Sequence, residues 1–309
     1  MTNYRNDWQA RNLEFIQKQI HWLQQQPDGI IFQQQISRNN SIAIKKINSL
    51  ILMLLADQET LTTNVAQSIL DLSNPLKLIF PYAQVVLLAL AWKSQPKNIY
   101  IVGFGGGTIP RFFHHYFPNT SIECTDIDST VVEVAQKFFG IQLDDRLKVT
   151  IQDGREYLEA QNQAVKYDFI ITDAGFGSGY MPYTLVTQEF YQLCKSRLSS
   201  GGVAVIHLFH KPEFNAAVVK TIQSVFAQVY ISNLETGNSL VIATNGLYLE
   251  QNEILLKAEI IQDFYNLGFS LIERSLQLKF VSQLPDSANT SASLPIFMDA
   301  EMPGGYLDG

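Results

Sequence analysis

A cluster of glycines directly after a short apolar run constrains this chain more than any other feature. The segment NIYIVGFGGGTIPRFF, residues 98–113, contains Gly103, Gly105, Gly106 and Gly107. Glycine tolerates a positive φ and lets another group approach the backbone where a Cβ would obstruct it. At the carboxyl end of a buried strand, such a turn predicts either a ligand lying against the backbone or a tight strand-to-helix connection.

Strand-type and helix-type segments alternate from residue 98 to residue 244. Such alternation predicts a parallel sheet covered by helices on both faces, that is, an α/β fold with a doubly wound, Rossmann-like sheet. The expected strands are 98–102, 121–126, 147–152, 169–172, 203–208, 228–232 and 239–244. The expected helices are 108–117, 129–139, 154–160, 187–198 and 213–226.

The chain before this region has a different pattern. Residues 4–26 predict an amphipathic helix, short strand-like runs between 29 and 56 predict a small antiparallel sheet, and a further helix is expected at 76–92. We therefore expect three parts. They are an N-terminal helix with a β-domain at 1–73, a nucleoside-binding α/β catalytic domain at 74–281, and a flexible, polar tail at 282–309.

Acidic residues follow three successive strands of the predicted sheet. Asp126 comes 19 residues after Gly107 and can accept two hydrogen bonds from a ribose cis-diol. Asp153, beside Gly154, can accept from an adenine amine, and Asp173 ends the next strand as an additional carboxylate. The pattern predicts a nucleoside site. The absence of GxxxxGK[ST] argues against a phosphate-binding P-loop, whereas a dinucleotide site stays open although the spacing is not GxGxxG.

Composition narrows the classes of partner. The 309 residues carry a net charge of −7 without a basic run, which argues against nucleic acid as a ligand. The longest apolar stretch, 78–92, is too short and too interrupted to span a membrane. No secretory signal is expected at the N-terminus.

The two cysteines are far apart and predict reduced thiols in a cytoplasmic protein. Adjacent His114 and His115 point to different sides of a helix, and no metal site is expected.

Several motifs together resemble the spermidine synthase family, the polyamine aminopropyltransferases, within the class I S-adenosylmethionine-dependent methyltransferases. The resemblance covers about residues 29–245 and implies a small N-terminal β-domain and a homodimer. The motifs are VGFGGGT (102–108), TDIDSTVVEVA (125–135), DGREYL (153–158), YDFIITD (167–173), TQEFYQLCKSRLSSGGVAV (187–205) and NPLKLIFPYAQ (74–84).

The resemblance also implies roles for individual residues. Asp126 matches the acidic ribose ligand, and Asp153 matches the adenine contact. Asp173 matches the catalytic Asp that hydrogen-bonds the acceptor amine, and Tyr82 matches a tyrosine that lines the acceptor cavity. The implied co-substrate is S-adenosylmethionine or its decarboxylated form, and the implied acceptor is a small-molecule amine.

Four positions depart from the family pattern. Gly105 replaces an acidic residue of the glycine loop, and Phe176 replaces a second Asp, three residues after the catalytic one. His207 replaces a glutamine at a strand end, and Leu234 replaces an aromatic residue. We expect Tyr82, Phe176 and His207 to contact the acceptor.

These departures leave three functions open. The first is aminopropyl transfer from decarboxylated S-adenosylmethionine to an amine, which Asp173 and the resemblance favour. The second is methyl transfer from S-adenosylmethionine, because Gly105 would not repel the carboxylate of the intact cofactor, and backbone N–H groups at the helix start could receive it. The third is a non-catalytic, nucleoside-binding homologue.

Overall fold

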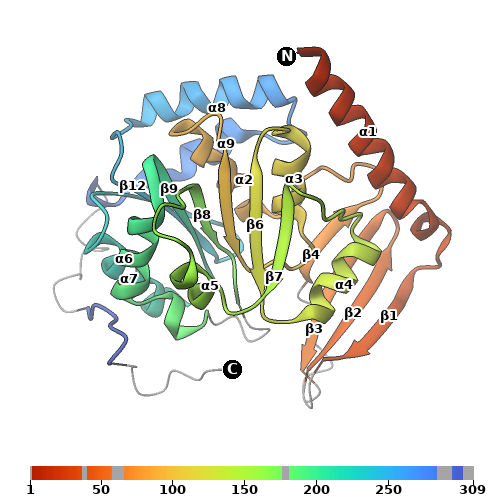
Figure 1. Cartoon of the computed structure of the whole chain (residues 1–309), viewed down its shortest axis with the longest axis horizontal. Helices are drawn as coiled ribbons and strands as arrows, with labels where there is room; N and C mark the ends of the chain where they lie inside the picture. Colours follow the sequence, from red (N-terminus) through yellow and green to blue (C-terminus); the bar gives the residue numbers. More distant parts are fainter. Residues whose placement is uncertain are drawn as a thin grey trace. The chain divides into compact units, whose positions relative to one another are not determined.

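The computed structural model describes residues 2–36, 40–57, 66–175, 181–209, 211–283 and 294–301 (Figure 1). These residues form two compact units. The first contains residues 1–80 and 103–152, and the second contains residues 81–102 and 153–309. The boundaries predicted from the sequence, at residues 73 and 281, differ from this division and stay a prediction.

The first unit begins with the helix α1 (Thr2–Ile20) and the short helix η1 (His21–Gln25). An antiparallel sheet follows, in the order β1-β2-β3-β4 (Figure 1). Ile16 and Ile20 of α1 are only 1% exposed, so the amphipathic helix buries its apolar side as its pattern predicts. The strands are β1 (Gly29–Gln35), β2 (Asn40–Ile47), β3 (Leu50–Asp57) and β4 (Ala66–Asp71).

The same unit contains two parallel strands, β6 (Ser121–Asp126) and β7 (Leu147–Ile151), in which Asp126 is paired with Ile151. The helices α3 (Thr108–Tyr116) and α4 (Ser129–Phe138) both contact β6. Asp128 caps α4 by accepting a hydrogen bond from the backbone N–H of Thr130 at 2.8 Å. The strand–helix alternation expected for this part is therefore confirmed.

The second unit contains six strands in the order β12-β10-β11-β9-β8-β5. β5 pairs in parallel with β8, and β8 pairs in parallel with β9. The other pairs, β10 with β11, β10 with β12 and β11 with β9, are antiparallel, and β10 and β11 form a hairpin. The predicted parallel sheet is found in β5, β8 and β9, whereas the late strands β10 and β11 are antiparallel, since a connection of a few residues cannot join parallel strands. The strands are β5 (Asn98–Val102), β8 (Tyr167–Thr172), β9 (Leu198–Leu208), β10 (Gln228–Asn233), β11 (Ser239–Thr244) and β12 (Leu278–Phe280).

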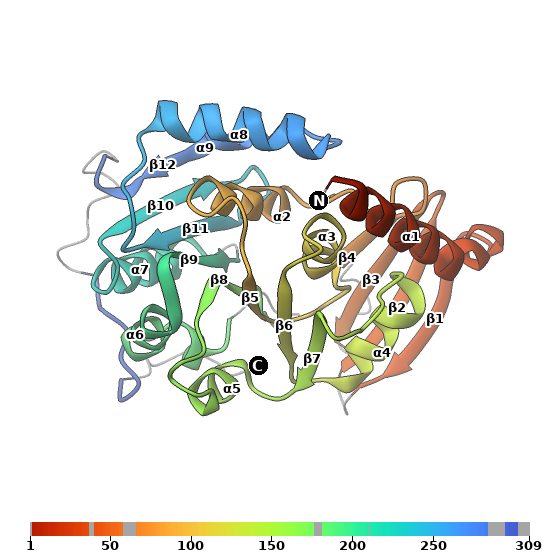
Figure 2. The same cartoon turned by 45° about the horizontal axis from the view of Figure 1, so that its top comes forward.

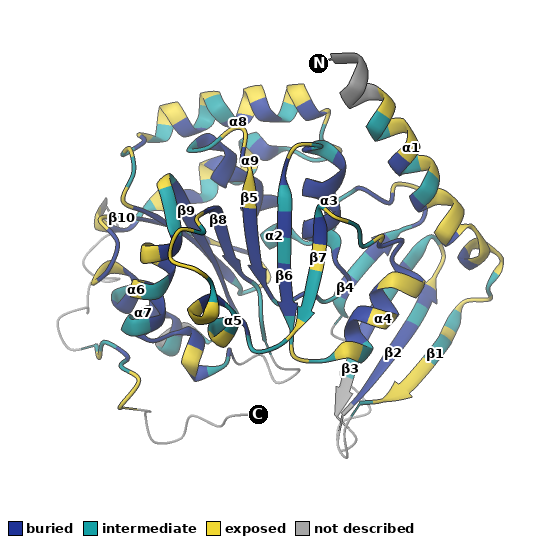
Figure 3. Ribbon diagram, viewed as in Figure 1, coloured by how far each residue is buried: buried dark blue, intermediate teal, exposed yellow. Residues whose placement is uncertain are grey.

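Helices cover both faces of these strands (Figure 2). On one face lie α2 (Pro81–Val86), η2 (Leu87–Ala91), α8 (Gln251–Tyr265) and α9 (Leu271–Gln277). On the other lie α5 (Gly154–Ala160), α6 (Gln188–Arg197) and α7 (Pro212–Gln223). Two further short helices are η3 (Tyr183–Leu185) and η4 (Val281–Gln283). Every residue of β8 and β11 is buried, as expected for strands packed on both faces. Figure 3 shows β8 in the dark blue of buried residues.

The last described segment, residues 294–301, packs within the second unit. Phe297 is 4% exposed, and its carbonyl accepts from the backbone N–H of Gln188 at 2.8 Å. Asp299 forms an ion pair with Arg155 at 2.6 Å. The remaining residues of the predicted tail, apart from 282 and 283, lie outside the described residues. Among the helices that the structure describes, none combines the length and the apolar character needed to cross a membrane.

Candidate functional site

The glycine loop lies in the first unit, directly after the last residue of β5 in the chain. The N–H of Gly103 donates to the carbonyl of Thr125 in β6 at 2.9 Å, and that of Gly107 donates to Phe104 at 2.9 Å. Gly107 precedes α3 with a φ of 65°, and a Cβ there would lie 2.6 Å from Ile141 Cδ1. Glycine is therefore needed at this position partly because of the protein's own packing. This supports the tight strand-to-helix connection, the alternative to ligand contact.

Asp126 ends β6, and its side chain binds the backbone of the glycine loop. Its Oδ2 accepts from the N–H of Phe104 at 3.0 Å, and its Oδ1 accepts from the N–H of Asp128 at 3.0 Å. Burial raises the pKa of the Asp126 carboxyl, and the N–H donors of Asp128, Phe104 and Gly105 oppose this rise. A carboxylate has about four acceptor positions, so these bonds leave Asp126 with further capacity for ribose hydroxyls.

Ser68 of β4 is a contact of this loop that the sequence did not reveal. Its Oγ accepts a hydrogen bond from the N–H of Gly106 at 2.8 Å, and Ser68 is 6% exposed. A Cβ at Gly105, whose φ is 52°, would lie 3.1 Å from the same Oγ. Spacing gave no signal for Ser68, because it lies 38 residues before Gly106 on a strand that the residue pattern had not predicted.

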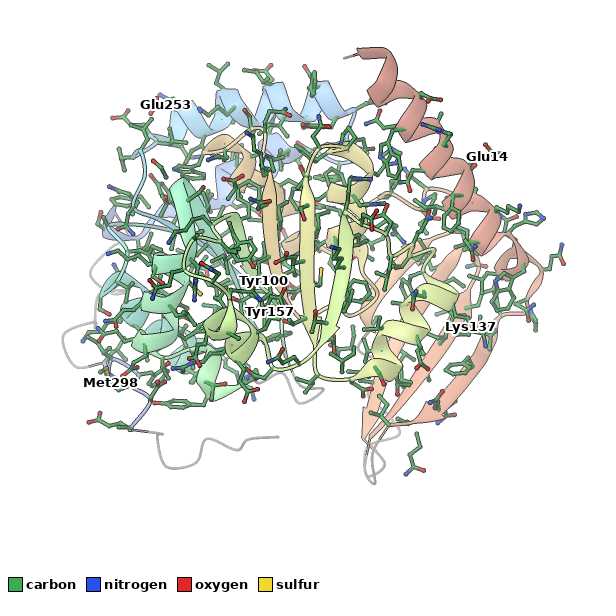
Figure 4. All side chains as sticks on the ribbon, viewed as in Figure 1. Glu14, Tyr100, Lys137, Tyr157, Glu253 and Met298 are labelled. Carbon is green, nitrogen blue, oxygen red and sulfur yellow. The ribbon has the colours of Figure 1, made fainter. Side chains whose placement is uncertain are left out.

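Asp153 and Gly154 begin α5 in the second unit. Asp153 Oδ1 caps this helix by accepting from the N–H groups of Arg155 and Glu156 at 2.9 and 3.0 Å. Tyr100 of β5 donates to the carbonyl of Gly154 at 2.6 Å, and its ring stacks on Tyr157 with centroids 5.3 Å apart (Figure 4). The start of α5 is thus positioned by the buried Tyr100 and the partly buried Tyr157, and the contact of Asp153 with adenine stays a prediction.

The second unit also brings together Asp173, Tyr82 and His207. Asp173 directly follows β8, and its backbone N–H donates to Val102 of β5 at 2.9 Å. The Tyr82 hydroxyl donates to Asp173 Oδ2 at 3.2 Å, and His207 Nδ1 lies 2.8 Å from Asp173 Oδ1. Both oxygens of the candidate catalytic carboxylate therefore have protein partners.

The rings of Tyr82 and His207 stack, with centroids 3.8 Å apart and an interplanar angle of 8°. Burial raises the pKa of the Tyr82 hydroxyl well above its usual value, and the negative charge of Asp173 raises it further. Tyr82 is consequently a neutral hydrogen-bond donor at any physiological pH. Two residues expected to contact the acceptor are thus packed around Asp173.

Phe176, the third residue expected to contact the acceptor, lies outside the described residues, as do all of 176–180. Leu234 is buried in the turn between β10 and β11, where its carbonyl accepts from the N–H of Gly237 at 2.9 Å. Within the described ranges, no group of three or more His, Cys, Asp or Glu side chains is arranged to hold a metal ion.

Comparison with known proteins agrees with this fold. The fold is a Rossmann-like α/β fold that spermidine synthases and methyltransferases share. The family model of the spermine/spermidine synthase domain matches residues 82–263. The chain therefore belongs to the spermine/spermidine synthase family.

The individual relatives include both aminopropyltransferases and a methyltransferase-like protein. A polyamine aminopropyltransferase of Vibrio vulnificus is 31% identical over 188 residues, which are 60% of this chain and 62% of that protein. The match thus spans less than two thirds of that relative's length. A probable spermidine synthase from Corynebacterium glutamicum superposes with a TM-score of 0.67 at 18% identity, covering 90% of this chain and 100% of that one. Human methyltransferase-like protein 13, solved in complex with SAH, superposes with a TM-score of 0.51 at 28% identity, covering 63% of this chain and 88% of that one.

Proposed function

We propose that this protein is a transferase that moves an aminopropyl group from decarboxylated S-adenosylmethionine to a small amine. The observation that carries the proposal is the position of Asp173. It follows a buried parallel strand and is hydrogen-bonded by Tyr82, within the segment that matches the spermine/spermidine synthase domain. Family members named polyamine aminopropyltransferase support the same reaction class.

The proposed donor site uses the glycine loop and Asp126 of the first unit. Asp126 is anchored by backbone N–H groups and has acceptor capacity left for a ribose diol. Ile127, the next residue, is 65% exposed although it is large and apolar. An exposed apolar side chain beside an anchored carboxylate suits a nucleoside, which has an apolar base face next to a polar sugar.

The proposed reaction is a displacement at the carbon next to a sulfonium. The acceptor must present a neutral amine, whereas a free alkyl ammonium has a pKa of about 10.4. A nearby carboxylate favours binding of the amine and helps to remove its proton. Asp173 supplies this carboxylate, and its Oδ2 accepts a hydrogen bond from the Tyr82 hydroxyl. In the proposed site, Asp153 contacts the adenine.

Methyl transfer from S-adenosylmethionine is the second candidate, and Gly105 favours it. An acidic residue there would need a positive φ and would meet Ser68 Oγ, since a Cβ would lie 3.1 Å from that atom. Without an acidic residue, the loop does not repel the carboxylate of the intact cofactor. Human methyltransferase-like protein 13, solved with SAH, has the same fold.

Two measurements test these functions. Titration calorimetry with S-adenosylmethionine and with its decarboxylated form shows which donor binds, and a panel of mono-, di- and triamines shows which acceptor reacts. Product mass separates aminopropyl from methyl transfer. Aminopropyl transfer predicts preference for the decarboxylated donor, whereas binding of either donor without turnover across the panel contradicts both reactions.

Two further proposals concern the setting of the protein. Cys124 and Cys194 are buried free thiols, which supports a reducing compartment such as the cytoplasm. The family resemblance supports a homodimer, which light scattering on the purified protein tests. Neither nucleic acid nor a membrane is proposed as a partner.

A further inference from the structure

The two ring nitrogens of His207 have different surroundings. Nδ1 lies 2.8 Å from Asp173 Oδ1, whereas Nε2 has no hydrogen-bond partner among the residues that the structure describes. The side chain is 3% exposed. An unsatisfied buried polar atom costs about 1–3 kcal/mol, and a bound donor would recover this cost.

The contact with Asp173 determines which nitrogen carries the proton. An ionised carboxylate only accepts hydrogen bonds, so Nδ1 must donate to Asp173 Oδ1. In a neutral imidazole, Nε2 is then the unprotonated nitrogen with a free lone pair. The Tyr82 ring, stacked at 3.8 Å, and the Phe209 ring, at 4.5 Å, hold the imidazole in this orientation.

The surroundings of Asp173 indicate that its charge acts mainly on protein groups. Oδ2 accepts from the Tyr82 hydroxyl, and Oδ1 accepts from the His207 imidazole. A carboxylate with two such partners is well placed to orient an imidazole and to stabilise it once it is protonated. The neighbouring Nε2 is the basic atom of this group that lacks a partner.

We propose that His207, rather than Asp173 itself, is the general base that takes the acceptor proton, and that Asp173 assists this proton removal as the positioning residue of His207. The inference rests on the function proposed above. The proton of the acceptor ammonium passes to Nε2 of His207. The amine nitrogen of the acceptor, now neutral, then attacks the carbon next to sulfur. The C–N bond forms as the C–S bond breaks, and the bonding electron pair stays on sulfur, which leaves as a neutral thioether. Asp173 stabilises the imidazolium that results.

The substitution His207→Gln tests the role of Nε2. Glutamine can still donate to Asp173 but has no basic nitrogen. We expect kcat to fall by about 10²–10⁴-fold. The affinity for the nucleoside should stay within about twofold. His21→Gln is the matched control, because His21 is exposed on η1 and takes no part in the site.

Nitrogen-15 NMR of histidine-labelled protein tests the proton position without turnover. The signals absent from His207→Gln identify His207 among the five histidines. We expect a protonated Nδ1 and an unprotonated Nε2, whose signal moves when an amine is added together with 5′-methylthioadenosine. A protonated Nε2 in the neutral imidazole overturns the proposal, as does a His207→Gln variant that keeps the kcat of the unmodified protein.

These readouts separate the two proposals. If the unmodified protein transfers no group to any amine, the proposed function fails, and the NMR experiment alone decides the role of His207. If the Nε2 signal then responds to the amine, His207 is still the group that accepts the proton of the amine. A signal that no amine changes removes His207 from that role.

Discussion

The Oγ of Ser68 accepts a hydrogen bond from the backbone N–H of Gly106 at 2.8 Å. This bond ties β4 of the antiparallel sheet to the glycine loop, within the first unit. The conformation of a proposed nucleoside-binding loop therefore depends on a residue outside the segment that matches the family domain, which begins at residue 82.

We predict that Ser68→Ala destabilises the protein and weakens nucleoside binding. The variant leaves the Gly106 N–H buried without an acceptor, which costs about 1–3 kcal/mol. Urea unfolding and calorimetry with the preferred nucleoside measure the two effects. Ser73→Ala is the control, because Ser73 is exposed in the turn after β4, and we expect it to change stability by less than about 0.5 kcal/mol. Equal stability of the two variants would show that the Ser68 bond contributes nothing.

Gly105→Ala should lower both stability and donor affinity. A left-handed conformation costs a residue with a Cβ roughly 1–2 kcal/mol, and the new Cβ would also lie 3.1 Å from Ser68 Oγ. Gly201→Ala is a matched control, because Gly201 has a φ of 69° and no atom lies within 4 Å of the position that its Cβ would take. Both variants should show the backbone cost, but only Gly105→Ala should raise the Kd of the nucleoside.

Asp173→Asn should lower turnover by at least about 10²-fold, while nucleoside affinity stays within about twofold. The amide has only one acceptor oxygen for Tyr82 and His207, and it carries no charge to stabilise a positive group. We expect the turnover rate to fall by about 10²–10⁴-fold or more as a result. Steady-state kinetics and calorimetry measure the two quantities. Asp145→Asn, at a position outside the site, controls for a general effect of charge. Turnover that Asp173→Asn leaves unchanged would exclude Asp173 from the reaction.

Asp168 should contribute stability that depends on pH. Burial raises the pKa of its carboxyl, but hydrogen bonds from Ser199, the Lys97 N–H and Lys93 together lower it below its usual value. A lowered pKa in the folded state means that the contribution is present above the unfolded value, near 3.9, and is lost as the pH falls through the folded value.

The substitution Asp168→Asn should therefore reduce the free energy of unfolding by about 1.5–3 kcal/mol at pH 7. The difference from the unmodified protein should shrink as the pH falls below about 4, where the unmodified carboxyl becomes protonated. Urea unfolding at a series of pH values measures this difference. A difference that is constant from pH 7 to pH 3 would contradict the role of the Asp168 charge.

The residue pattern predicted most of the α/β elements because their signals are local. Strands 98–102, 121–126 and 239–244 begin and end as expected, and so does the helix 154–160. The pattern did not predict β4, and it did not indicate that β10 and β11 are antiparallel. Strand direction depends on how a connection folds, and periodicity does not report it.

The sequence by itself determined that a glycine loop follows one strand and that Asp126, Asp153 and Asp173 come at or just after the ends of three others, because these features lie within single strand–turn–helix segments. Only the tertiary structure decided which side chains meet. Tyr82 lies 91 residues before Asp173, and His207 lies 34 residues after it. Such contacts form when distant segments pack into one core, and no local pattern of residues encodes that packing.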